Sequence, residues 1–129
     1  MTAPSLGPPV DELVTIEVVE SGSSVSVQAA GEIDSTSAPL LRRQLDTLLE
    51  GEVRELTVDL GRVTFLDSAG LCVLAAAHRR ALRQDVQMRV LASSRAVIRP
   101  LQITGLWDLL HAEQVGESSP TIPVQQGVA

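Results

Sequence analysis

The sequence predicts an α/β fold in which a single mixed β-sheet of four to five strands is covered by helices on one face. Segments of alternating polarity and segments with helical spacing of apolar residues follow each other in the order β-β-α-β-α-β-α-α. Every strand segment alternates between apolar and polar residues, whereas strands covered on both faces are apolar throughout. We therefore expect an open two-layer arrangement rather than a doubly wound sheet.

Composition narrows the class of protein. The chain has 129 residues, of which 44% are hydrophobic, so it can form one globular domain with a single core. Its formal net charge is −6, all ten basic residues are arginines, and it contains one Phe, one Trp and no Tyr. Nucleic-acid binding requires basic patches and aromatic stacking surfaces. We expect protein partners, with no direct contact to nucleic acid.

Targeting features predict a cytoplasmic protein without membrane contact. No segment approaches the length of a membrane span, and residues 1–9 contain neither a basic residue nor an apolar run of the signal-peptide kind. The single cysteine, Cys72, excludes an internal disulfide bond. We expect its side chain to fill space in the core behind the start of a helix.

The N-terminal part predicts a hairpin after a flexible lead. Residues 1–10 contain three Pro and one Gly and are expected to be flexible. Residues 13–19 and 24–30 each alternate between apolar and polar side chains, which is typical of strands. The polar segment 20–23 between them predicts a turn.

A helix follows the second strand, and its start can be placed from a proline. Pro39 must lie in the first helical turn, because deeper in a helix it would remove a hydrogen bond and clash. The helix is therefore expected to begin between Asp34 and Ala38 and to end at Gly51.

The centre of the chain predicts a strand that passes through a tight turn into a second helix. Apolar residues alternate with Glu55, Thr57 and Asp59 along the strand. After Asp67 the apolar residues recur at helical spacing as far as about Gln84; they are Leu71, Leu74, Ala75 and Leu82.

The C-terminal part predicts one more strand and two helical segments. Residues 86–90 alternate as a strand, and Ser93 or Ser94 can cap a helix that Pro100 should kink or shorten. A final helical turn is expected at 106–111. From Gln114 the chain is polar and without periodicity, so we expect a folded domain over 11–113 and a disordered tail over 114–129.

Ser68 stands where the central strand delivers the chain to a helix N-terminus. That end of a helix has unpaired N–H groups and a partial positive charge, which suit a phosphate group. One interpretation is that Asp67 or Ser68 simply caps the helix, as these residue types commonly do. The other is that Ser68 accepts a phosphoryl group, which would add up to two negative charges beside Asp67.

Other reactive side chains predict no catalytic, cofactor or metal site. His78 and His111 have no neighbouring ligands at metal-binding spacing. Leu66 stands where a nucleophile elbow, G-x-S-x-G, requires its first glycine. The arginines at 79, 80 and 83 are interpreted as a solvated helix face.

Two motifs resemble those of the STAS domain, and most closely those of bacterial anti-sigma factor antagonists. The first is Gly31-Glu32-Ile33-Asp34, followed by Ala38-Pro39-Leu40 and a helix rich in Leu and Arg. The second is Val58-Asp59-Leu60 with Phe65-Leu66-Asp67-Ser68-Ala69-Gly70-Leu71. The resemblance covers roughly residues 11–113 and implies the STAS fold. Ala69 replaces a second serine often found in the motif, which leaves Ser68 as the acceptor.

The resemblance implies partner switching. The unmodified protein would bind an anti-sigma factor that is also a serine kinase, and so free a sigma factor. Phosphorylation of Ser68 would end binding, and a serine phosphatase would restore it. In such a role the chain is a regulatory protein and no enzyme, and is expected to be a monomer or weak dimer. Residues expected to contact the partner are Gly31, Asp34, Leu66, Asp67, Ser68 and Gly70.

Two alternatives stay open. Asp34 can be an ordinary turn or capping residue instead of a partner contact. The whole chain can also be a STAS scaffold, or an accessory subunit of a larger signalling complex or transporter, without phosphorylation, because one fold serves several functions.

Overall fold

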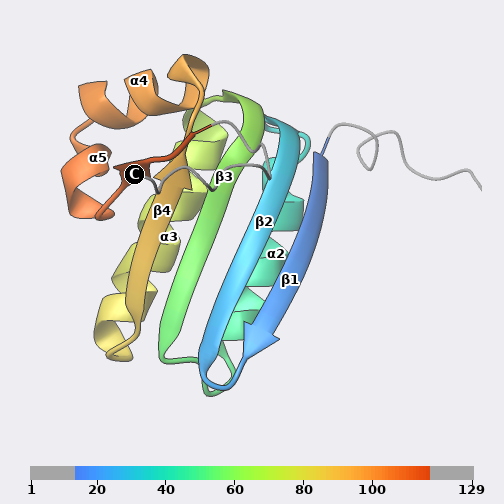
Figure 1. Cartoon of the computed structure of the whole chain (residues 1–129), viewed down its shortest axis with the longest axis vertical. Helices are drawn as coiled ribbons and strands as arrows, with labels where there is room; N and C mark the ends of the chain where they lie inside the picture. The colour runs from blue at the N-terminus through green and yellow to red at the C-terminus, as the bar shows by residue number, and fades with distance from the viewer. Residues whose placement is uncertain (1–13, 117–129) are drawn as a thin grey trace, which may run out of the picture.

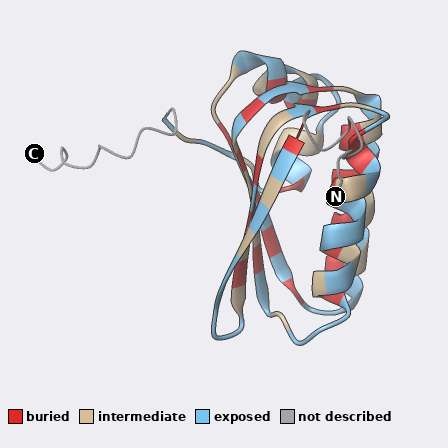
Figure 2. Ribbon diagram, turned by 90° about the vertical axis from the view of Figure 1, so that its right-hand side faces the viewer, coloured by how far each residue is buried: buried red, intermediate tan, exposed pale blue. Residues whose placement is uncertain are grey.

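The computed structural model describes residues 14–116, which form one five-stranded sheet with two long helices packed on one face (Figures 1 and 2). The strands are β1 (Val14–Ser21), β2 (Ser24–Ile33), β3 (Glu55–Leu66), β4 (Gln87–Ala92) and β5 (Glu113–Gln114). They lie in the sheet in the order of the sequence. β1 and β2 are antiparallel and the other pairs are parallel, so the sheet is mixed as predicted.

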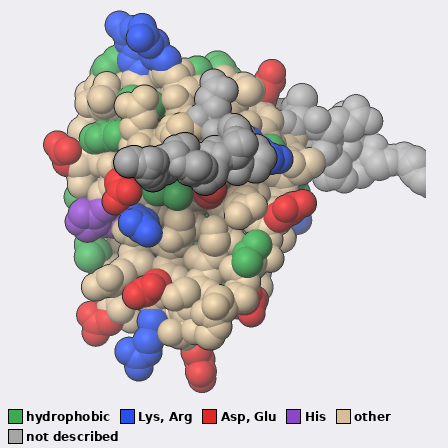
Figure 3. Space-filling model, viewed as in Figure 1, with side chains coloured by type: hydrophobic (Ala, Val, Ile, Leu, Met, Phe, Trp, Pro, Cys, Tyr) green, Lys and Arg blue, Asp and Glu red, His purple; other side chains and the backbone are tan. Residues whose placement is uncertain are grey.

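The helices connect the parallel strands. α2 (Ala38–Leu49) and α3 (Ser68–Arg83) cover one face, and α4 (Arg95–Ile103) and α5 (Leu106–Leu109) lie beyond them at the β4 side (Figure 1). On the opposite face, acidic and basic side chains are scattered over the surface (Figure 3). The expected one-sided, two-layer sheet is confirmed.

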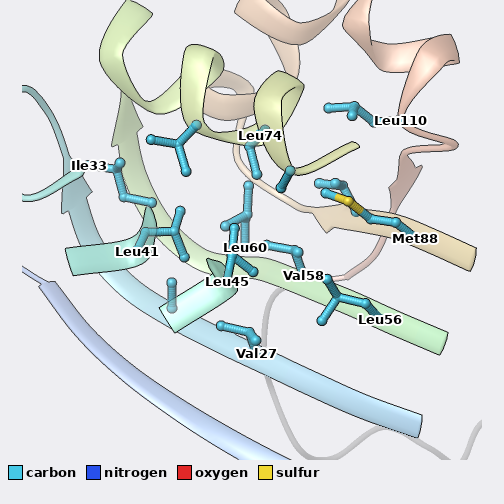
Figure 4. Close-up of a cluster of buried hydrophobic side chains, with 14 of the residues drawn as sticks. Val27, Ile33, Leu41, Leu45, Leu56, Val58, Leu60, Leu74, Met88 and Leu110 are labelled. Atoms are coloured by element: carbon cyan, nitrogen blue, oxygen red, sulfur yellow. The ribbon is translucent and has the colours of Figure 1, made fainter. Parts of the chain in front are cut away.

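The core lies between the sheet and α2 and α3. Val27, Val58 and Val90 are paired side by side on three neighbouring strands, and all three are fully buried. The apolar stripe of α2 packs on them, as the close-up in Figure 4 shows for Leu41 and Leu45. The inward-facing residues of the strands, which recur every second position, and the apolar stripe of the helix, which recurs about every 3.6 positions, thus form one apolar layer.

Two local predictions from the first half of the chain are confirmed. β1 and β2 form a hairpin in which Ser21 pairs with Ser24 and Gly22 adopts a φ of +62°, which glycine allows without steric cost. α2 begins at Ala38 with Pro39 in its first turn, where the missing N–H group has no helical partner to lose.

The central strand is longer than its alternation indicates. The regular pairing of β2 with β3 shifts between Gln28 and Ala30 and again between Gly31 and Glu32. After these irregularities β3 continues to Leu66, so that Asp67 alone separates it from α3. A bulged strand loses its simple alternation, and for this reason its second half does not read as a strand.

The prediction of a disordered chain from Gln114 onward is wrong for Gln114 and Val115. Glu113 and Gln114 form β5 beside β4, and the N–H of Val115 donates to the carbonyl of Ala92 over 2.8 Å. A two-residue strand has too few positions to show a period, and its pairing comes from β4. The tail beyond 116 and the lead over 1–10 lie outside the described residues.

The buried face of α3 also differs from the expectation. Cys72 is exposed, and Leu82 is 62% exposed, because the helix turns Val73, Leu74 and Ala77 toward the sheet instead. Neighbouring helix positions differ by about 100°, so a stripe of small apolar residues can be oriented in more than one way. The expected role of Cys72 as a core residue is therefore wrong.

Candidate functional site

The N-terminus of α3 is organised by the carboxylate of Asp67. Asp67 is the N-cap residue with extended backbone angles (φ −106°, ψ −169°), and its Oδ1 accepts hydrogen bonds from the N–H groups of Ala69 (2.9 Å) and Gly70 (3.3 Å). These N–H groups belong to the first turn and have no partner inside the helix. Of the two residues that could cap α3, Asp67 is the one whose side chain does so, and the Ser68 hydroxyl takes no part in the cap.

Ser68 is the first residue of α3 and is exposed to solvent. Its main chain is held between β3 and the capped helix turn, so the hydroxyl projects from a fixed position. The helix end favours negative charge there, while the Asp67 carboxylate next to it opposes a second anion. The site therefore presents a reachable serine in a place where added charge acts strongly on its surroundings.

The first turn of α3 packs closely on the strand ends through Leu66 and Gly70. Both are buried, and a Cβ built on Gly70 would clash with Leu66 Cδ1 and lie 2.9 Å from Ile33 Cγ2. The absent side chain lets the first turn of α3 lie directly on the ends of β2 and β3. These two residues thus set the height of Ser68 above the sheet.

A second turn, Asp34 to Ser37, lies at the end of β2. Asp34 Oδ1 accepts hydrogen bonds from the N–H groups of Thr36 (2.9 Å) and Ser37 (3.1 Å). These two hydrogen bonds, first that of Ser37 and then that of Thr36, are the main causes that lower the pKa of the Asp34 carboxyl. Hydrogen bonds to a carboxylate favour its charged form. Asp34 is half-buried and ionised, and its structural role in the turn is established by these contacts.

Ser37 is a structural part of this turn that the sequence analysis did not single out. It is fully buried, its hydroxyl donates to the Glu32 carbonyl over 2.7 Å, and it accepts from the N–H of Asp34 over 3.0 Å. The signal was present, since Ser37 directly precedes the helix and serine is a common residue there. The Ser37 side chain does not cap α2, however; it bonds to the main chain of Glu32 and Asp34 and so connects the turn to the end of β2.

The two turns lie side by side because their strands are parallel neighbours. Ile33 pairs with Leu66, and the N–H of Asp67 donates to the Ile33 carbonyl over 3.1 Å. Asp34 and Asp67 therefore follow paired residues at the same edge of the sheet. The structure brings both predicted acids and Ser68 to one surface.

Gly31 and Phe65 complete that edge. Gly31 has a φ of +108° where the pairing of β2 with β3 shifts by one residue, a conformation that favours glycine, and its carbonyl accepts from Thr64 Oγ1 over 3.3 Å. Phe65 pairs with Glu32 and is 45% exposed, although an aromatic side chain in a strand is usually buried. Phe65 was part of the second motif, but its exposure follows from the irregular strand and could not be predicted.

Neither a metal site nor a membrane span is found in the described part of the chain. Over residues 14–116 no group of three or more His, Cys, Asp or Glu side chains is arranged to hold a metal ion. In the same range, no helix combines the length and apolar character needed to cross a membrane.

Comparisons with known proteins give consistent results. The anti-sigma-B factor antagonist of Bacillus subtilis is 33% identical over 104 residues, which are 81% of this chain and 94% of that protein. The crystal structure of an anti-sigma factor antagonist from Mycobacterium paratuberculosis has a TM-score of 0.73 at 30% identity and covers 83% of this chain and 89% of its own.

A third relative shares the fold alone. The Bacillus cell fate determinant SpoIIAA, solved in its phosphorylated form, has a TM-score of 0.65 at 19% identity, over 80% of this chain and 93% of its own. The family model of the STAS domain matches residues 15–119. With the mixed sheet, the capped serine turn and this match over most of its length, the chain belongs to the STAS domain family.

Proposed function

We propose that this chain is an anti-sigma factor antagonist regulated by phosphorylation of Ser68. In its unmodified form it binds an anti-sigma factor that is also a serine kinase, and so releases a sigma factor. The kinase transfers the γ-phosphoryl group of ATP to Ser68 Oγ, with loss of the hydroxyl proton and formation of ADP. A serine phosphatase later hydrolyses the phosphoester. The exposed serine at the first position of α3 carries the proposal.

The geometry supports a kinase substrate. Ser68 is exposed, and the Asp67 carboxylate already satisfies N–H groups of the first turn, so phosphorylation does not have to disrupt the cap. The main chain at Ser68 is fixed on both sides by a strand and a helix. The backbone that carries the hydroxyl is therefore already ordered, which reduces the ordering cost that a flexible segment would add to binding.

The surface around Ser68 supports a protein interface. Phe65 supplies exposed aromatic area, and Asp34 and Asp67 supply fixed carboxylates at the same edge of the sheet. Aromatic residues surrounded by polar groups are typical of the energetically important part of an interface. Leu66 and Gly70 belong to the proposed binding region because they are buried under the first turn of α3 and support it. Gly31 belongs to it because its positive φ lies where the pairing of β2 with β3 shifts.

Electrostatics explain how phosphorylation would end binding. Phosphoserine carries about −1.5 to −2 charges at pH 7 and would lie beside Asp67. A partner surface that accepts a neutral hydroxyl there must then desolvate a dianion next to a carboxylate. A penalty of about 2.7 kcal/mol lowers the affinity by about a hundredfold. The chain acts as the substrate and binding partner and needs no catalysis of its own, and we place the exchange in the cytoplasm because it consumes ATP.

The experiment compares the wild type with Ser68→Ala, Ser68→Asp and Ser21→Asp. Ser21 is exposed at the hairpin end of β1, so Ser21→Asp adds the same charge away from the site. Tagged proteins are expressed in the native host, and co-purifying proteins and phosphate on Ser68 are quantified by mass spectrometry. We expect an ATP-binding anti-sigma factor with the wild type, Ser68→Ala and Ser21→Asp, and much less of it with Ser68→Asp.

The other outcomes distinguish the alternatives. Equal recovery of the same partners by all four proteins, with no phosphate on Ser68, contradicts phospho-regulation and indicates a STAS scaffold. Recovery of a transporter in place of an anti-sigma factor contradicts the proposed partner itself. Equal loss with Ser68→Asp and Ser21→Asp shows a net-charge effect unrelated to the serine.

A further inference from the structure

A cavity of about 540 Å³ lies at the opposite end of α3 from Ser68. Its floor consists of Leu56, Val86 and Met88, which are buried, and Leu56 and Met88 are paired on neighbouring strands (Figure 4). His78 forms part of the wall, ten positions along α3 from Ser68, or about 15 Å at the helical rise per residue. The lining also includes the polar strand residues Glu55, Thr57, Gln87 and Arg89. A cavity of this size with apolar side chains and a few polar groups is typical of small-molecule sites.

His78 is a buried polar side chain with no protein partner. It is 5% exposed, and its ring makes no hydrogen bond to another residue in the range 14–116. Within that range Ser94 Oγ is the only fully enclosed side-chain polar atom that lacks a partner. The His78 ring nitrogens are therefore not sealed in the core, and they reach the cavity that the residue lines. A molecule that enters the cavity can therefore form a hydrogen bond with a ring nitrogen that no side chain of residues 14–116 occupies.

His111 brings a second imidazole to the same cavity from a distant part of the chain. It follows α5 and is exposed at the rim, and its N–H donates to the Asp108 carbonyl over 3.1 Å. The next residue, Ala112, donates to the Trp107 carbonyl over 2.9 Å. These two hydrogen bonds fix the turn on which His111 lies. Two imidazoles from distant parts of the chain thus line one cavity.

The local field at His78 is positive. Burial is the main cause that lowers the pKa of His78, and the charges of His111 and Arg79 lower it further. Two charged groups of the strands also line the cavity. Arg89 is offset by Glu113 at 3.3 Å, whereas Glu55 accepts only from the neutral Ser24 Oγ over 2.9 Å, so a carboxylate remains at the Glu55 end and a bound anion must lie toward His78 and His111. A bound anion would offset the positive field at His78, whereas a bound cation would add to it.

We propose that the His78 cavity binds a small carboxylic acid with an apolar body. The apolar part lies on Leu56, Val86 and Met88, and the carboxylate accepts hydrogen bonds from the imidazoles of His78 and His111. This ligand site is separate from the Ser68 surface and independent of the proposed switching function. Leu82, which is 62% exposed at the rim, lies where it would influence the charged end of such a ligand.

Octanoate and octan-1-ol are the probes, because they share the apolar chain and differ in the carboxylate. Binding to the full-length protein is measured by NMR, through amide shifts and the ring-proton titration of His78. We expect octanoate to bind at the cavity and to raise the pKa of His78, because the carboxylate stabilises the imidazolium. Octan-1-ol should bind at least about tenfold more weakly, which corresponds to 1.4 kcal/mol.

Variants at an exposed position give a second readout without endangering the fold. Leu82→Glu should weaken octanoate at least about tenfold by charge repulsion, and Leu82→Arg should preserve or strengthen it. Val19→Glu is the matched control, since Val19 is 51% exposed on β1 and the change in net charge is the same. Val19→Glu should bind octanoate like the wild type.

Three results would overturn the proposal. Equal affinity for octanoate and octan-1-ol indicates a merely apolar cavity. An unchanged His78 titration with octanoate bound shows that the carboxylate lies elsewhere. Equal weakening by Leu82→Glu and Val19→Glu shows a net-charge effect and no local contact.

Discussion

The N–H of Asp67 donates to the carbonyl oxygen of Ile33 over 3.1 Å, and this contact ties the start of α3 to the end of β2. It connects the two turns that carry the acids of the two motifs, Asp34 and Asp67. The turns are more than thirty residues apart in the sequence, yet they form one rigid edge.

Asp67→Ala is expected to destabilise the fold by about 1 kcal/mol, because the N–H groups of Ala69 and Gly70 lose their acceptor. Asp67→Asn retains a side-chain oxygen and should stay within about 0.5 kcal/mol of the wild type. Urea denaturation followed by circular dichroism gives both values. Equal losses for the two variants would show that the charge at the helix end matters and the hydrogen bonds do not.

Gly70→Ala should cost about 1–3 kcal/mol, because its new methyl group meets Leu66 and Ile33 in a packed interior. Gly51→Ala is the matched control. A Cβ there meets only the Leu48 carbonyl oxygen at 3.5 Å, which is ordinary contact, so its stability should change by less than about 0.5 kcal/mol. Thermal unfolding of both variants measures the difference, and a tolerated Gly70→Ala would contradict the close approach of α3 to the strands.

Asp34 should titrate below its ordinary pKa of 3.8, because its carboxylate accepts hydrogen bonds from Ser37 and Thr36. A carboxyl with a lowered folded-state pKa stabilises the fold above its unfolded-state pKa, and this contribution is lost as the pH falls through the folded-state pKa. Carbon-detected NMR of the side-chain carboxyl gives the titration directly. In Asp34→Asn the corresponding loss of stability in acid should disappear. A normal titration of Asp34 would mean that the turn opens in solution.

Phe65→Ala should weaken binding of the proposed anti-sigma factor by about tenfold or more, since exposed aromatic side chains often dominate an interface. Its effect on folding should be small, because Phe65 is already 45% exposed. Val19→Ala is the control, as Val19 is similarly exposed but lies on β1, away from the two turns. Isothermal titration with the purified partner compares them. Equal affinity of Phe65→Ala and the wild type would place the interface elsewhere.

Gln84→Ala should destabilise the fold by about 1 kcal/mol. Gln84 Nε2 donates to the Leu49 carbonyl over 2.6 Å, and its Oε1 accepts from Arg80 Nε over 2.8 Å, so the side chain joins the ends of α2 and α3. Gln44→Ala, on the exposed face of α2, should change little. Denaturation midpoints provide the test, and equal midpoints for both variants would show that the bridge contributes nothing.

The sequence predicted well those elements whose signals are local. The hairpin follows from two alternating segments and a polar turn, and Pro39 limits where α2 can begin. The position of Ser68 after a capping acid is also local, because a cap and the residues it caps are neighbours in the chain. The packing of Gly70 against Ile33, by contrast, involves strands that only the fold brings together.

The sequence by itself determined the one-sided sheet, the order of its elements from β1 to α5 and the serine at the start of α3, because periodicity and capping depend on residues a few positions apart. Only the tertiary structure decided that Val73 faces the core while Cys72 faces solvent, and that Phe65 is exposed. It alone brought His78 and His111 to one cavity. Such arrangements depend on packing between distant segments, and no local pattern of residues records them.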